Sequence, residues 1–61
     1  MNAKRRKRIA AAVTVLDTAY GEEEAYFANM PENLQEGDPG EEARLAIDAL
    51  ETAIDALEEL V

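Results

Sequence analysis

The sequence has no cysteine, histidine, serine or tryptophan, and these absences exclude whole classes of function. Without His, Cys and Ser, the usual nucleophile and general-base pairs of enzymes do not occur. Without a Cys or His cluster there is no zinc site. Without Cys there is no disulfide, which leaves the redox compartment undetermined. The acids at 22–24 are consecutive and point around a helix, so they do not converge on one metal ion. We therefore expect no enzyme activity, no metal and no cofactor.

Large apolar side chains are also scarce, with one Phe and two Tyr in 61 residues. A chain of this size buries only about 60% of its unfolded surface even as a compact domain, and two helices side by side bury less. Ordering the chain costs roughly 1.5 kcal/mol per residue. Because neither a disulfide nor a metal supplements the core, the composition favours self-association.

No apolar run is long enough to cross a bilayer. The basic segment 4–8 followed by the apolar segment 9–16 has the order of a signal peptide, but Asp17 ends the apolar run and no Ala-x-Ala cleavage pattern follows. We therefore expect a cytoplasmic protein without membrane contact.

What the sequence does contain is a repeat. Ala-Ile-Asp-Ala-Leu-Glu occurs at 46–51 and again at 53–58, seven residues apart, which is the heptad of packed helices. The same heptad fits residues 9–30, where only Glu23 breaks the apolar seam. The a and d positions of both segments form the predicted oligomer core: Ile9, Val13, Leu16, Tyr20, Phe27, Ile47, Leu50, Ile54, Leu57 and Val61.

Helix-breaking residues divide the chain into two helices, at about 3–29 and 39–60, joined by a connector at 30–38. The first helix stops before Pro31, which disfavours helical geometry in the residue before it. Asp38, Pro39 and Glu41 predict a capping box with Asp38 as the N-cap. We expect Leu34 in the connector to fold back and plug the end of the bundle. The prediction is an all-α, single-domain antiparallel hairpin over residues 1–61.

Alanines flank the seam at the c and g positions of the second helix and at g of the first. They widen the apolar arc of each helix to about 160°, more than one neighbouring helix covers. The simplest closed arrangement is a homodimer in which a two-fold axis pairs two hairpins into an antiparallel four-helix bundle, with higher oligomers left open. Glu23 has two interpretations: a solvated side chain near the loop end, or a polar group that specifies register and oligomer state.

The net charge of −8 is unevenly distributed. Residues 1–20 carry five basic side chains and one Asp, whereas residues 21–61 carry one Arg and thirteen acids. The basic cluster either lies beside Glu58, Glu59 and the negative end of the second helix, or contacts nucleic acid from a protruding turn. No aromatic residue is interleaved with it, which argues against nucleic acid. The residues concerned are Lys4, Arg5, Arg6, Lys7 and Arg8.

An acidic stripe occupies the b and e positions of the second helix: Asp48, Glu51, Asp55 and Glu58. Such a row is commonly a solvated face that keeps a small oligomer soluble. The alternative is a recognition surface for a basic protein partner, including mimicry of a nucleic-acid backbone.

The segment 26–35, Tyr-Phe-Ala-Asn-Met-Pro-Glu-Asn-Leu-Gln, is followed by Gly37, Glu41-Glu42-Ala43 and the two heptads. Over roughly 20–61 this pattern resembles small, uncharacterised helical-hairpin proteins encoded by bacteria, phages and prophages. The resemblance implies a phage or mobile-element setting and carries no established activity or functional residues. We therefore predict a non-enzymatic, homo-oligomeric interaction module, such as an accessory protein that binds a host protein. The alternative is a small nucleic-acid-associated factor.

Overall fold

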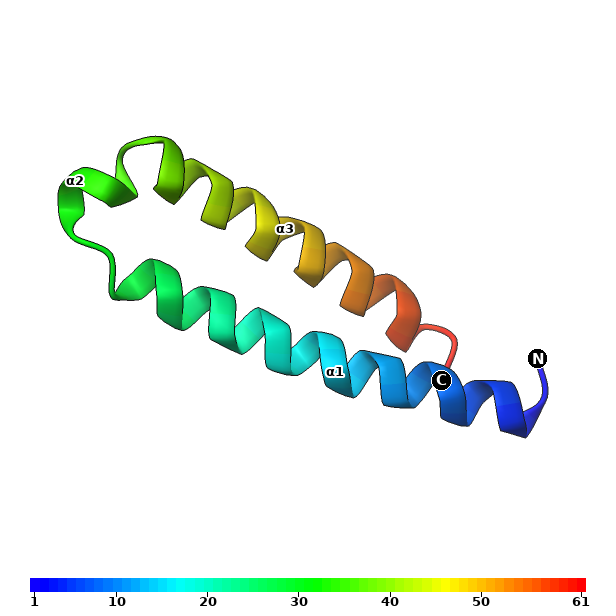
Figure 1. Ribbon diagram of the computed structural model, residues 1–61. Coiled ribbons are helices and arrows are strands. Elements are labelled where there is room, and N and C mark those ends of the chain that lie inside the picture. The colour runs from blue at the N-terminus through cyan, green and yellow to red at the C-terminus, as the bar shows by residue number, and fades with distance from the viewer.

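The computed structural model describes all residues, 1–61, as three helices without any strand. α1 spans Ala3–Ala28, α2 spans Glu32–Gln35 and α3 spans Asp38–Glu58. α1 and α3 lie side by side and run in opposite directions, and α2 lies in the connection between them (Figure 1). The Cα atoms extend over 48 × 14 × 11 Å, so the molecule is a single layer of helices. The predicted all-α hairpin is confirmed.

α1 begins at a side-chain cap that the sequence analysis did not identify. The backbone N–H of Arg5 donates to Oδ1 of Asn2 at 2.9 Å, which satisfies one of the free N–H groups of the first turn. The first turn contains no acid, and it is basic instead. Positive side chains at the positive end of a helix dipole are unfavourable. Within one chain, no acidic side chain in the first turn offsets the repulsion between the basic segment and the positive end of the helix dipole.

α3 begins one residue earlier than expected, and the predicted capping box is wrong. Its N-cap is Gly37, with extended backbone (φ −97°, ψ −167°) and no side-chain cap. Asp38 instead lies inside the first turn with Glu41, where both carboxylates favour the helix dipole. At the other end the helix stops at Glu58 rather than at 60. Val61 follows that last turn and is 53% exposed, so it does not occupy a helical a position.

The connector is also more ordered than predicted, because residues 32–35 form the single turn α2. Leu34 is 41% exposed, so the expectation that it plugs the bundle end is wrong. The turn directs Gln35 inward instead, where its Nε2 donates to the carbonyl oxygen of Phe27 at 2.9 Å. Met30 fills the loop end and is only 9% exposed.

The hydrophobic core of the hairpin is a thin strip. Only four apolar side chains are buried: Val13, Met30, Ala43 and Ile54. The remaining predicted core residues within the helices are half-buried. This is the expected outcome for a single layer, in which each seam residue is covered by one neighbouring helix and remains open on its flanks.

Candidate interaction surfaces

Near the loop, Arg44 of α3 lies at the level of Phe27 of α1, with its guanidinium carbon 5.0 Å from the centroid of the Phe27 ring. Such a contact joins α1 and α3 through a cation–π interaction. The helices are antiparallel, so the same level is reached by counting backward along α1 and forward along α3. Twelve residues from the Phe27–Arg44 contact, Val15 of α1 therefore lies opposite Ala56 of α3. The same register places residues 3–8 of α1 beyond the end of α3.

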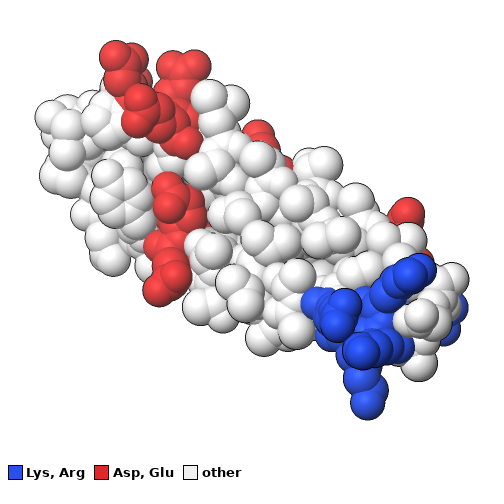
Figure 2. Space-filling model, turned by 45° about the vertical axis from the view of Figure 1, so that its right-hand side comes forward, with Lys and Arg blue, Asp and Glu red and all other residues white.

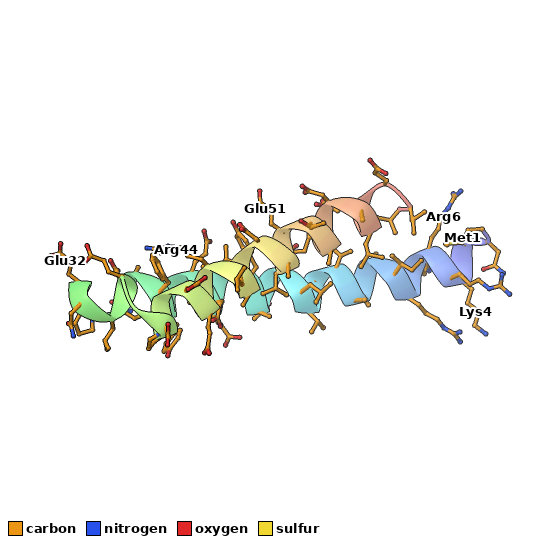
Figure 3. The ribbon with its side chains drawn as sticks, turned by 90° about the horizontal axis from the view of Figure 1, so that it is seen from above. Met1, Lys4, Arg6, Glu32, Arg44 and Glu51 are labelled. Atoms are coloured by element: carbon orange, nitrogen blue, oxygen red, sulfur yellow. The ribbon has the colours of Figure 1, made fainter.

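The hairpin has two different faces. In an antiparallel pair of helices, each heptad position that flanks the seam lies beside the same position of the other helix. The e positions of both helices therefore share one face of the layer, and the g positions share the other. Figure 3 shows this division: Arg6, Arg44 and Glu51 point to one side of the layer, and Lys4 points to the other.

The first of these faces, which we call the charged face, carries the predicted acidic stripe. Its residues are Asp48, Glu51, Asp55 and Glu58 of α3, with Asp17 and Glu24 of α1, and all of them are exposed. Burial raises the pKa of the Tyr20 phenol above its ordinary value of 10.0, and the negative charges of Glu24, Glu51 and Asp48 raise it further. Tyr20 on α1 thus lies in the negative field of α3.

The opposite face, which we call the apolar face, is built from alanines and exposed large side chains. Val15 is 68% exposed, Tyr26 57% and Leu60 46%. Alanines fill the positions between them, and several are exposed as well. The face comprises Ala12, Val15, Ala19, Tyr26, Ala49, Ala53, Ala56 and Leu60. The alanine columns that widened the predicted apolar arc are therefore open to solvent in one chain.

The basic end consists of Lys4, Arg5, Arg6, Lys7 and Arg8, and all five are exposed. No nitrogen of these side chains lies within 4.0 Å of a carboxylate oxygen. The alternative in which the basic cluster pairs with Glu58 and Glu59 therefore has no ion pair within one chain to support it, and α1 continues past the last turn of α3 (Figure 1). Figure 2 shows the positive side chains gathered at this end and most of the acidic side chains of this face toward the loop, with a few acidic side chains in the middle and near the basic end.

Glu23 is half-buried at the d position of α1. It is neither fully solvated nor enclosed within one chain, so both interpretations of its role stay predictions. The structure holds no pocket and no group of three His, Cys, Asp or Glu residues that would suit a metal ion. None of its helices combines the length and the apolar character that a membrane span requires.

Comparison with known proteins gives no match: no family model, no curated protein and no solved structure matches the chain. The resemblance to phage and bacterial helical-hairpin proteins accordingly stays a prediction.

Sequence reasoning missed three residues that position these surfaces. Gln35 and Gly40 hold the loop together, and Arg44 lies over the Phe27 ring. Gly40 gave a usable signal, because a glycine in the first turn of a helix suggests close backbone contact. Arg44 was visible only as the one basic residue after position 20.

Proposed function

We propose that this protein is a non-enzymatic, homo-oligomeric interaction module whose functional unit is a homodimer with a four-helix core. The observation that supports it best is the exposure of the apolar face. Three large side chains on one side of the hairpin are 46–68% exposed, while only four apolar residues are buried in the whole chain. A contiguous exposed apolar face of this kind is typical of a protein–protein interface.

The size of the face fits a dimer. The Cα atoms of the layer span 48 by 14 Å, so a second layer laid fully across it would cover an area of the same order as the ~800 Å² per partner of a standard interface. Packing a second layer on it would cover the open flank of the half-buried seam. The core that one hairpin lacks would then come from the second copy.

The dimer leaves the charged face outward, where it is available to another protein. We propose that Asp48, Glu51, Asp55 and Glu58 bind a basic surface of that partner, in the manner of an accessory protein of a phage or prophage that binds a host protein. Four acids in consecutive turns of one helix give a linear array of negative charge, which speeds association with a positive surface.

Self-association is tested by sedimentation velocity on the wild-type chain and on Val15→Asp, with Thr14→Asp as the matched control. Val15 lies on the apolar face, whereas Thr14 is exposed on the outer side of α1 and bonds the carbonyl of Ala10. We expect the wild type and Thr14→Asp to sediment as dimers and Val15→Asp to dissociate. Equal behaviour of the two variants would contradict the proposal.

The acidic array is tested by capture of basic proteins from the host of origin, comparing wild type with a variant in which Asp48, Glu51 and Asp55 are changed to Asn, Gln and Asn. Binding through this face should weaken in the variant and with added salt, because exposed charges separated by more than ~8 Å are screened at physiological ionic strength. A partner retained equally by both proteins would place its site elsewhere.

A second candidate function is nucleic-acid contact by the basic end, and one observation favours it: these five side chains are exposed and unpaired. Filter binding of DNA and RNA at low salt, with full-length chain and a chain lacking residues 1–8, tests it. Salt-sensitive binding that disappears with the deletion would support this function, and the absence of binding by the full-length chain would eliminate it.

A further inference from the structure

The side of α1 that contributes to the apolar face also carries charged side chains toward both ends of the helix, positive near the N-terminus and negative near the loop. From the N-terminus, the residues along this stripe change from basic to apolar to acidic and aromatic. In chain order they are Lys4, Arg8, Ala12, Val15, Ala19, Glu22 and Tyr26, spaced by three or four residues so that they share one side of the helix.

Two copies of this stripe that run in opposite directions are complementary in charge. Arg8 and Glu22 lie seven residues on either side of Val15, and Lys4 and Tyr26 lie eleven residues on either side. When two copies of α1 pack antiparallel about Val15, Arg8 of each copy meets Glu22 of the other. Lys4 of each copy likewise reaches the Tyr26 ring of the other, a cation–π geometry. The alanines between them allow the two helices to approach closely.

Two hairpins that stack face to face can be related by either of two two-fold axes, and the charge pattern distinguishes them. With the loops at the same end, α1 packs on α3 of the second copy, and two basic ends lie together with five positive side chains each. The acidic loop ends would lie together as well. With the loops at opposite ends, α1 packs on α1, and each basic end meets an acidic loop end.

From this we infer that the chain forms a homodimer with its loops at opposite ends, in which α1 packs antiparallel on α1 about Val15 and Arg8 contacts Glu22 of the second copy. Because Val15 lies at the level of Ala56, the two α3 helices meet only at their last turns, and the α1–α1 contact forms most of the interface. The inference rests on the proposed function, since it presupposes a dimer. It gives the basic end a partner that one chain lacks: no carboxylate lies within 4.0 Å of it. It also compensates the basic first turn of α1, which lies at the positive end of the helix dipole.

Cysteine cross-linking tests the orientation cleanly because the chain has no native cysteine. In the inferred dimer, Val15→Cys lies on the two-fold axis and should oxidise to a covalent dimer. Thr14→Cys, which faces outward, should not. With the loops at the same end, Val15 lies opposite Ala56 of the second copy instead. Val15→Cys alone would then stay reduced, and its mixture with Ala56→Cys would cross-link.

Charge reversal provides the independent second test, read as the dimer dissociation constant by sedimentation equilibrium at low salt. Arg8→Glu and Glu22→Arg should each weaken the dimer about tenfold, and the double variant should restore it. With the loops at the same end, Arg8→Glu relieves repulsion and tightens the dimer. A dimer that behaves in this second way overturns the orientation and leaves the proposed function standing. A wild-type chain that stays monomeric overturns both.

Discussion

Gly40 brings the backbone of α3 into close contact with the backbone of α2. It is buried in the first turn of α3, and a Cβ atom built there would overlap the backbone of Gln35. A side chain at this position therefore forces the loop apart, since backbone has little freedom to move aside. By contrast, a Cβ at Gly21 in α1 meets nothing within 4 Å.

The two glycines make a matched pair of stability predictions. Gly40→Ala should lower the free energy of unfolding by about 1–3 kcal/mol, the usual cost of overpacking. Gly21→Ala should raise it by about 0.5–1 kcal/mol, because alanine is the better helix former. Urea denaturation followed by circular dichroism at one fixed protein concentration measures both. A Gly40→Ala protein as stable as wild type would show that the α2–α3 contact is loose.

Tyr20 provides a pH-dependent prediction. Its pKa is raised by burial and by Glu24, Glu51 and Asp48, so the folded chain retains the phenol proton at a pH where the unfolded chain releases it. The unfolded state then binds fewer protons, and stability falls as pH rises above about 10. Below that pH the contribution is fully present.

In a Tyr26→Phe background, the ultraviolet absorbance titration of Tyr20 should have its midpoint above 10.0. Glu24→Gln should move that midpoint down, because it removes the largest of the three charge contributions. A midpoint that Glu24→Gln leaves unchanged would mean that Tyr20 lies outside the negative field of the charged face.

At the scale of elements, the loop is held to α1 by a side chain rather than by a helix cap. Gln35 of α2 donates to the Phe27 carbonyl at the end of α1, and the bond is partly buried. Gln35→Ala should lower the free energy of unfolding by about 0.5–1.5 kcal/mol, the net value of such a hydrogen bond. Asn33→Ala, an exposed change in the same turn, should have little effect. Equal effects in thermal unfolding would assign the loss to helix propensity instead.

The two long helices could be predicted from sequence because heptad spacing and Pro31 are local signals. The loop could not. Asp38 matched a capping motif, yet Gly37 adopts the extended cap conformation and leaves Asp38 within the helix. Leu34 was expected to point inward because it is apolar, but it is exposed. The single turn of α2 directs Gln35 toward α1 instead. Both outcomes depend on how α2 packs against α3, and no short-range pattern encodes that packing.

The candidate surfaces also differ in how far the sequence predicts them. The acidic stripe and the alanine columns could be identified from spacing alone, because helix periodicity determines which residues share a face. The position of the basic end required the register between α1 and α3, which follows from the Arg44 contact with Phe27. The sequence already raised a protruding basic turn as one alternative, and the register places residues 3–8 beyond the last turn of α3, where they have no ion-pair partner.

At the scale of the whole molecule, a single layer of helices with one apolar and one charged face is an incomplete core. Four buried apolar residues give a 61-residue chain little hydrophobic stabilisation to oppose its conformational entropy. A second copy supplies the missing layer. Folding should therefore be coupled to association, and the midpoint of thermal unfolding should rise with protein concentration.

The most direct test of this account is sedimentation equilibrium combined with circular dichroism over a dilution series from micromolar to nanomolar concentration. We predict a mass twice the chain mass of 6.7 kDa at the upper end, with helical signal and dimer lost together on dilution. A chain that keeps its full helical signal as a 6.7 kDa monomer at nanomolar concentration would contradict the account, since the hairpin would then be stable without a second copy.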